Sequence, residues 1–283
     1  MLPEAVEEKI AAVAVDHQSG ATHLAERALR AFDLLVASGS ADRSSVQELA
    51  RRLEAAQPAM ASVRTVSRLA AKFLLETPDN WPAFVASMQR ELGEGRRKAG
   101  RNFLKLLEGP ATVLTLSRST NVFECLVAAH QKGLIREVLV LESRPLREGV
   151  EFAQDLHDAG VAVAVIADGA AGAFVTSATL GLTGADTVLV DGSVVNRAGT
   201  YPLAALCRAA GKPFYAACET FKIDTTRSAK DWRPPPEQDP KEVVADLPAR
   251  NPYFDLTPGS LVSGLVTERG VYKPELIRQA FAR

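Results

Sequence analysis

The chain has 283 residues, which is longer than one typical domain and favours two domains. Hydrophobic residues make up 47% of it, enough for a packed core, so an intrinsically disordered chain is excluded. The 33 lysines and arginines balance the 34 aspartates and glutamates, so the overall charge gives no basis for binding nucleic acid.

The N-terminal stretch MLPEAVEEKIAAVAVDHQSG is acidic and amphipathic, and it lacks the basic start and apolar centre of a signal peptide. No apolar run in the chain is long enough to cross a bilayer. The three cysteines and four histidines have no spacing typical of metal ligands or of a disulfide framework. We therefore expect a cytoplasmic protein with no metal site and no membrane contact.

Residues 1–108 are predicted to form a helical domain. SVQELARRLEAA has Ser45 and Glu48 at capping-box spacing, and its apolar residues fall on one helical face. The next helical pattern, MASVRTVSRLAAKFLLE, is broken at Thr77-Pro78, and a further helix is expected from about Asp79 to NFLKLL. Gly109-Pro110 then ends the helical region.

From residue 109 the hydrophobic period changes. The short apolar runs ATVLTL, EVLVLE, VAVAVIAD, DTVLVD and PFYAAC alternate with helix-like segments. Strands separated by helices are typical of a mainly parallel sheet that is covered on both faces. The fold class is therefore α/β, with a Rossmann-like domain over residues 109–283. GxGxxG and GxxxxGK[ST] are both absent from the sequence, so we predict neither a dinucleotide nor any other cofactor.

One connection is unusually polar. In VLVDGSVVNRAGTYPLAAL (188–206), we expect an apolar strand to lead into a helix through a loop of small polar residues. Connections of this kind, at the carboxyl ends of strands, are where open α/β sheets bind ligands. The helix after Thr200 is expected to offer its first backbone N–H groups to an anion.

Polar clusters follow several of the predicted strands and should meet at one sheet edge. Four of their members are cations, which suits a phosphorylated ligand held by charge-assisted hydrogen bonds: Arg118, Arg144, Arg197 and Lys222. Asp186 opens an apolar strand, so burial should raise its pKa towards the range useful in acid–base chemistry. The alternatives are structural: Asp186 could cap a turn, and Arg144 could pair with Glu142 or Glu148.

Several segments together resemble the initiation factor 2B alpha/beta/delta superfamily, which includes methylthioribose-1-phosphate isomerase and ribose-1,5-bisphosphate isomerase. They are VLTLSRSTNVFECLVAAHQKG, LVLESRPLREG, GADTVLVDGSVVNRAGTYPLA, KPFYAACETFKID and NPYFDLTPGSLVSGLVTERGVYKPEL. DHQSGATHLAERAL is similar to the first sugar-phosphate loop of that superfamily, so the resemblance extends over nearly the whole chain. It implies the architecture described above and a homodimer formed through the C-terminal domain.

The isomerases convert an aldose 1-phosphate to a ketose 1-phosphate with a cysteine and an aspartate. The resemblance places that aspartate at Asp186. The cysteine belongs to a THC motif, but this chain has TLS there, so Ser117 stands in its place. A thiol titrates near neutral pH, whereas a serine hydroxyl needs a strong adjacent base. No histidine is next to Ser117 in the sequence.

Three further positions depart from the isomerase pattern: Gln57 replaces an arginine, Glu148 a glutamine and Arg197 a lysine. The SRS segment resembles regulatory initiation-factor subunits, which bind sugar phosphates without turnover. The residues expected to bind the ligand are Gly20, Ala21, Gln57, Arg118, Ser119, Arg144, Glu148, Asn196, Arg197 and Lys222.

These observations favour a protein that binds a phosphorylated sugar or a nucleoside monophosphate and has lost isomerase activity. An active isomerase on ribose 1,5-bisphosphate or a related ribose 1-phosphate is the first alternative, and a regulatory interaction subunit is the second. No membrane or nucleic-acid partner is expected.

Overall fold

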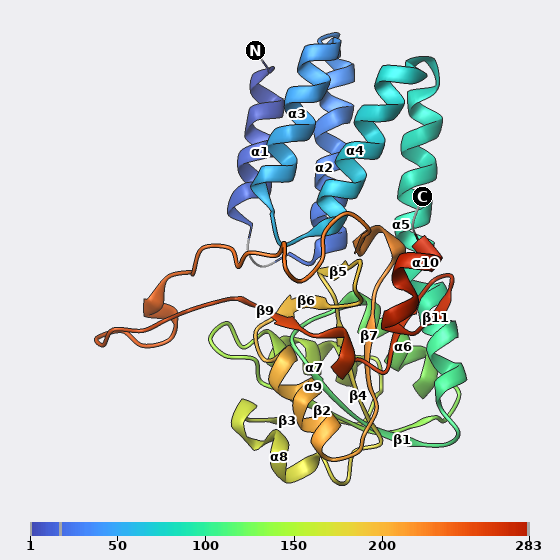
Figure 1. Ribbon diagram of the computed structural model, residues 1–283, viewed down its shortest axis with the longest axis vertical. Coiled ribbons are helices and arrows are strands. Elements are labelled where there is room, and N and C mark those ends of the chain that lie inside the picture. Colours follow the sequence, from blue (N-terminus) through green and yellow to red (C-terminus); the bar gives the residue numbers. More distant parts are fainter. Residues whose placement is uncertain (1, 17–18, 282–283) are drawn as a thin grey trace. The chain divides into compact units, whose positions relative to one another are not determined.

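The computed structural model describes residues 2–16 and 19–281 (Figure 1). The chain forms two compact units, Met1–Glu94 and Gly95–Arg283, which are described separately below. Helix α5 (Trp81–Phe103) begins in the first unit and ends in the second. The assignment of residues 1–108 and 109–283 to separate domains stays a prediction.

The first unit is helical. It contains α1 (Glu4–Val15), α2 (Ala21–Ala37), α3 (Arg43–Ala56), α4 (Ala61–Glu76) and the start of α5, which lie side by side in Figure 1. Each presents an apolar face to the others, and Leu24, Leu35 and Leu49 are fully buried between them. The break expected at Thr77-Pro78 is present, because α4 ends at Glu76 and Pro78 starts a short 3-10 turn.

The predicted capping box at Ser45 is wrong. Helix α3 begins at Arg43, and its N-cap is Asp42. The Asp42 carboxylate accepts a hydrogen bond from the backbone N–H of Ser45 at 2.9 Å. An ionised carboxylate at this position also complements the positive end of the helix dipole, so the helix begins earlier than the Ser45–Glu48 spacing indicated.

The second unit is built on a seven-stranded sheet in the order β11-β10-β7-β4-β1-β2-β3. Its strands are β1 (Ala111–Leu116), β2 (Ile135–Leu141), β3 (Val163–Ile166), β4 (Leu180–Gly184), β7 (Phe214–Ala217), β10 (Gly264–Thr267) and β11 (Gly270–Tyr272). All neighbours pair in parallel except β10 and β11. The predicted α/β class with a mainly parallel sheet is confirmed.

Helices cover both faces of this sheet. Along β1 and β2, Val113 and Val138 pack with α5, with α6 (Thr120–His130) and with α7 (Glu148–Asp158). Their neighbours Leu114 and Leu139 point to the opposite face and pack with α8 (Ala171–Phe174), α9 (Thr200–Ala209) and α10 (Ile277–Phe281). Alternate residues of a strand point to opposite faces, which is why these strands appear as continuous apolar runs.

A second, four-stranded sheet was not predicted. It has the order β8-β5-β6-β9 and contains β8 (Ile223–Asp224), β5 (Thr187–Leu189), β6 (Val194–Arg197) and β9 (Phe254–Thr257). The expected polar loop over 188–206 is therefore wrong in its first half, which is a hairpin. Gly192, with φ of 77°, turns the chain, and β6 returns antiparallel to β5.

Short 3-10 turns complete the structure at Pro78–Asn80, Leu104–Leu106, Asp168–Ala170, Thr220–Lys222, Pro240–Glu242, Gly259–Leu261 and Pro274–Leu276. Among the described helices, none has the length and hydropathy that crossing a bilayer requires.

The strand order fixes where the sheet changes direction. From β1 the chain moves to β2 and β3 on one side, and then to β4, β7 and β10 on the other. The point between β1 and β4 is a topological switch point, and ligands of open α/β sheets bind outside the carboxyl ends of the strands at such a point. Ser117 directly follows β1 and Asp186 follows β4, so these two residues flank it.

Candidate functional site

Ser117 lies in a strained turn at the end of β1. Its φ is 61°, in the left-handed region that few residues other than glycine adopt. Its backbone N–H donates to Oγ of Ser143 at 2.7 Å, and its hydroxyl donates to Oε1 of Glu148 at 2.5 Å. The serine in the position of the family's cysteine therefore has a carboxylate as its partner.

The connection between β2 and α7 brings Glu148 to this position. Asp168 accepts hydrogen bonds from the backbone N–H groups of Ser143 at 2.8 Å and Arg144 at 2.7 Å, which fixes the loop. A Cβ atom on Gly149 would lie 1.9 Å from the carbonyl oxygen of Leu141. Only glycine lets the start of α7 lie this close to the end of β2, and Glu148 is the first residue of that helix.

Arg197, at the end of β6, holds the same carboxylate. Its Nε lies 3.1 Å from Oε1 of Glu148. The guanidinium also lies over the rings of Tyr253 and Phe254, each with its centroid at 5.2 Å. Cation–π contacts and a carboxylate together fix the orientation of this side chain.

Asp186 is buried and belongs to a second set of charges. Desolvation raises its pKa, and the positive charges of Lys222 and Arg197 offset part of that rise. Lys222 Nζ lies 3.5 Å from Oε2 of Glu219, and Nδ2 of Asn121 donates to the same oxygen at 2.8 Å. The negative charge of Glu148 also raises the pKa of Asp186, so the two sets of charges interact.

The four predicted cations do not form one open rim. Arg118 turns along α7, where its Nε lies 2.8 Å from Asp155, and 53% of its side chain is exposed. Arg144 donates to the backbone carbonyl of Val243 at 3.1 Å, and not to Glu142 or Glu148. The sequence places these residues at strand ends correctly, but the direction of each long side chain depends on which acceptors the fold brings near.

Arg144, Glu148 and Arg197 nevertheless line one pocket. The other residues that line it are Ser143, Pro145, Leu146, Ala198, Pro252 and Tyr253. Ser117 and Asp186 are not among the lining residues, and Ser117 contacts Glu148 through its hydroxyl. The lining of the pocket thus contains two guanidinium groups and one carboxylate around a cavity of about 20 Å³, which is space for about one water molecule.

The expectation that α9 offers its N-terminus to an anion is wrong. Asp255, on β9, accepts hydrogen bonds from the backbone N–H groups of Gly199 at 2.8 Å and Tyr201 at 3.0 Å. Asn196 does not reach into the pocket lining either, because its Nδ2 donates to Oγ1 of Thr200 at 2.9 Å. Sequence reasoning gave Asp255 no role, although it lies within the quoted segment NPYFDLTPGSLVSGLVTERGVYKPEL.

Helix α6 differs from α9 in the partners of its first backbone N–H groups. Ser119 is its N-cap and accepts from the N–H of Val122 at 3.4 Å. The N–H groups of Arg118, Ser119, Thr120 and Asn121 have no acceptor among residues 2–16 and 19–281. Helix N-termini of this kind bind phosphate through backbone N–H groups and the helix dipole.

Three predicted residues belong to the first unit. Gly20 precedes α2 and Ala21 is its first residue, whereas residues 17 and 18 of the same predicted loop lie outside the described residues. The side-chain amide of Gln57 donates to the carbonyl oxygens of Val13 at 2.7 Å and Asp16 at 3.1 Å. Gln57 thus ties the end of α3 to the end of α1.

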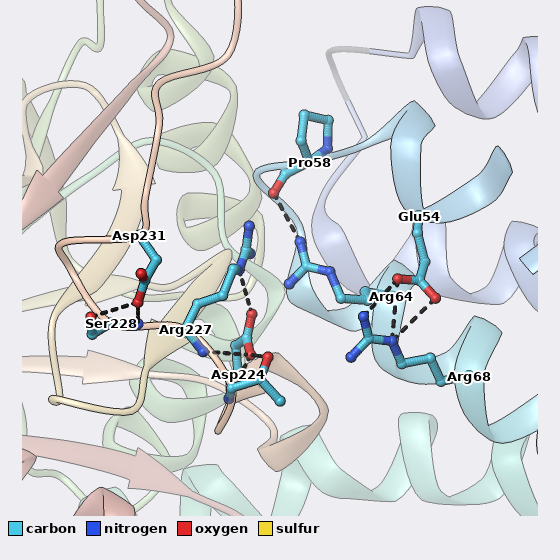
Figure 2. A network of polar contacts seen from close by, with 9 residues as sticks. Glu54, Pro58, Arg64, Arg68, Asp224, Arg227, Ser228 and Asp231 are labelled. Atoms are coloured by element: carbon cyan, nitrogen blue, oxygen red, sulfur yellow. Dashed lines mark hydrogen bonds and ion pairs between the residues drawn. The ribbon is translucent and has the colours of Figure 1, made fainter. Parts of the chain in front are cut away.

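Figure 2 shows polar contacts within each unit. In the first, Arg64 donates to the carbonyl oxygen of Pro58 at 3.2 Å, and Arg68 pairs with Glu54 at 2.9 Å. In the second, Arg227 pairs with Asp224 at 2.7 Å (Figure 2). Asp224 is buried, and it also accepts from the hydroxyl of Thr226 at 2.6 Å. These contacts fix helix and loop positions inside each unit.

The cysteines lie in the apolar core of the second unit. Cys125, Cys207 and Cys218 are all buried and free of disulfides. Burial raises the pKa of Cys207 to about 11 and that of Cys218 to about 12. Within the part of the chain that the structure describes, no group of histidine, cysteine and acidic side chains is arranged to hold a metal ion.

Comparison with known proteins agrees with this architecture. The chain is 32% identical to a Pyrococcus furiosus protein named as a translation initiation factor eIF-2B subunit 2-like protein, covering 97% of this chain and 98% of that one. It is 32% identical to a ribose 1,5-bisphosphate isomerase of Haloferax volcanii, over 91% and 85% of the two chains. The crystal structure of the translation initiation factor eIF-2B of Pyrococcus horikoshii OT3 superimposes with a TM-score of 0.87, at 30% identity and over 96% and 98% of the chains. Since the profile of the initiation factor 2 subunit (IF-2B) family also matches residues 17–274, the chain belongs to that family.

Proposed function

We propose that the second unit binds a phosphorylated sugar or a nucleoside monophosphate at the switch point between β1 and β4. One observation carries the proposal: the N-terminus of α6, with unengaged N–H groups, follows β1 directly at this point. Arg144 and Arg197 line a pocket on the adjacent β2–α7 and β6 connections. Cations and helix N–H groups are the partners that phosphate oxygens prefer.

The names of relatives support this ligand class. The Haloferax volcanii relative is named as an isomerase of ribose 1,5-bisphosphate, which is a phosphorylated sugar. The Pyrococcus furiosus relative is named for a translation factor, which keeps the interaction-subunit alternative open for testing. The homodimeric state and the cytoplasmic location remain predictions from the sequence.

Ligand-induced stabilisation tests the proposal. Ribose 1,5-bisphosphate or AMP at about 100 times its Kd should add roughly 2.7 kcal/mol to the free energy of unfolding and raise the Tm by several degrees. Arg197→Gln should reduce the shift, because it removes a guanidinium from the pocket. Arg136→Gln, at the amino end of β2, is the matched control and should leave the shift unchanged. A broad panel of phosphosugars and nucleotides that leaves the Tm unmoved would remove the proposal.

Binding and turnover are separate questions for this site. Loss of turnover was expected because Ser117 has no base beside it in the sequence. In the fold, the carboxylate of Glu148 lies within hydrogen-bond distance of its hydroxyl. The fold therefore places a carboxylate beside Ser117, where the sequence showed no base.

A further inference from the structure

Glu148 is the acidic side chain that a ligand in the pocket would meet. It lines the pocket with 16% of its side chain exposed, whereas Ser117 is only 5% exposed and lies outside the lining. Ser117 and Arg197 both contact Oε1 of Glu148. The other oxygen, Oε2, has no partner among the described residues, so it is the oxygen left to face a ligand.

The contact joins two departures from the isomerase pattern. Ser117 stands in place of a cysteine and Glu148 in place of a glutamine, and in this fold the two side chains touch at 2.5 Å. A serine hydroxyl can take a proton from a substrate only after a strong base has removed its own proton, whereas a carboxylate accepts a proton directly. The capacity to take up a proton thus lies on Glu148 and not on Ser117.

We propose that Glu148 is the catalytic base of an aldose–ketose isomerisation, with Ser117 as the residue that positions its carboxylate. The proposal rests on the binding function proposed above, because the sugar phosphate must occupy the site. Two contacts orient the carboxylate of Glu148. The Ser117 hydroxyl at 2.5 Å and the Arg197 guanidinium at 3.1 Å both hold Oε1, and by fixing Oε1 they also fix the direction of Oε2.

The proton transfers balance without a co-reactant. Protonated Asp186 gives its proton to the ring oxygen of the aldose 1-phosphate as the bond between that oxygen and C1 breaks. Oε2 of Glu148 takes the proton from C2, and the electron pair of that C–H bond forms the C1–C2 double bond of an enol. The enol hydroxyl then returns a proton to Asp186 while Glu148 protonates C1, which yields the ketose 1-phosphate and restores both side chains.

Asp186 suits the acid role. It is buried, and the charges of Lys222, Arg197 and Glu148 all act on it, so it belongs to the same cluster of charges as Glu148. Burial, the largest cause, and the charge of Glu148 both favour a proton on Asp186, against the opposing charges of Lys222 and Arg197. Opposite protonation states on two neighbouring carboxyl groups are what an acid and a base require.

Turnover in D₂O, followed by NMR, tests the proposal with ribose 1,5-bisphosphate and methylthioribose 1-phosphate. The wild-type protein should form the ketose and incorporate solvent deuterium at C1. Glu148→Gln should keep the ligand-induced Tm shift and lose about 10² to 10⁴-fold in kcat. Glu148→Asp, which keeps the carboxylate, should retain part of the activity. This variant shows whether the loss in Glu148→Gln comes from the missing carboxylate or from the new amide group. Glu151→Gln is the control on the same helix, because its side chain is exposed at the surface, and it should keep the wild-type kcat.

The separate effects on kcat and KM test the role of Ser117 as a positioning residue. Ser117→Ala should lower kcat less than Glu148→Gln and leave KM nearly unchanged. Circular dichroism and the ligand-free Tm show that each variant is folded.

Two results would overturn the role of Glu148: a wild-type protein that shows the Tm shift with these ligands but neither turnover nor deuterium incorporation, or Glu148→Gln with the wild-type kcat. A wild-type protein that shows no Tm shift with any phosphosugar would instead remove the binding function itself.

Discussion

Oδ2 of Asp255 accepts a hydrogen bond from the backbone N–H of Gly199 at 2.8 Å, although the two residues are 56 positions apart. Asp255 belongs to β9, and Gly199 is the N-cap of α9 with φ of 105°. The second sheet thus supplies the anion that the start of α9 needs. Burial raises the pKa of Asp255 to about 6, although the N–H groups of Tyr201 and Gly199 oppose the rise.

This pKa predicts how Asp255 affects stability as the pH changes. Because the folded pKa of about 6 lies above the ordinary value of 3.8, ionising Asp255 costs more in the folded state than in the unfolded state. Its contribution is therefore complete below pH of about 4 and is lost as the pH rises through about 6. Between these limits, the free energy of unfolding of wild type should fall relative to Asp255→Asn by up to about 3 kcal/mol. Urea denaturation of both proteins across this range measures the difference, and a constant difference would contradict the prediction.

Gly149 should tolerate no side chain. A Cβ atom there would lie 1.9 Å from the carbonyl oxygen of Leu141 and 2.9 Å from Oγ of Ser143, so either β2 or the start of α7 must move. We expect Gly149→Ala to lower the free energy of unfolding by at least about 2 kcal/mol. It should also weaken ligand binding, because Glu148 moves with the helix.

Gly172 provides the control for this substitution. It lies in α8, in the same unit, with no atom within 4 Å of the position of a Cβ atom. Gly172→Ala should be neutral or slightly stabilising. Denaturant titrations measure the free energy of unfolding of both variants. Equal changes in the two would show that the close approach of α7 to β2 does not require glycine at position 149.

The sequence predicted the parallel strands well and the side-chain contacts of the site poorly. Strand β1 and the second half of β2 are buried on both faces, and the apolar runs of β1, β2 and β3 make these strands recognisable. Strand β6 has only four residues, two of them polar, and it is a strand because β5 and β9 pair with it, which local composition does not reveal. The bond between Ser117 and Glu148 joins residues 31 positions apart, so only the folded β2–α7 connection creates it.

The predicted homodimer should be visible by light scattering. At micromolar concentration we expect twice the chain mass of 30.3 kDa. Tyr201, in the C-terminal domain through which the resemblance implies dimerisation, is 46% exposed in the single chain. Tyr201→Lys should therefore shift the equilibrium towards monomer. Val165→Lys is the control, because Val165 has the same 46% exposure but lies on the edge strand β3. A wild-type protein that stays monomeric at all concentrations would remove the claim.

The effect of placing a thiol at position 117 follows from the neighbours of Ser117. Arg118 and the start of α6 would be expected to lower the pKa of a thiol there, but the Arg118 guanidinium pairs with Asp155 at 2.8 Å and does not face the site. The Ser117 hydroxyl instead contacts the Glu148 carboxylate and is buried. Burial and a neighbouring negative charge both oppose a thiolate, so the thiol of Ser117→Cys should titrate above the ordinary value of about 8.5.

Removing the carboxylate should reverse part of that rise. In the double variant Ser117→Cys with Glu148→Gln, the thiol pKa should fall by about 1 to 3 units relative to Ser117→Cys alone, because the like charge is gone. The rate of alkylation by iodoacetamide as a function of pH measures both values. The natural cysteines add little background, since Cys125, Cys207 and Cys218 are buried with raised pKa values. Equal thiol pKa values in the two variants would mean that Glu148 does not set the electrostatics at position 117, and the base proposed here would lose its main structural support.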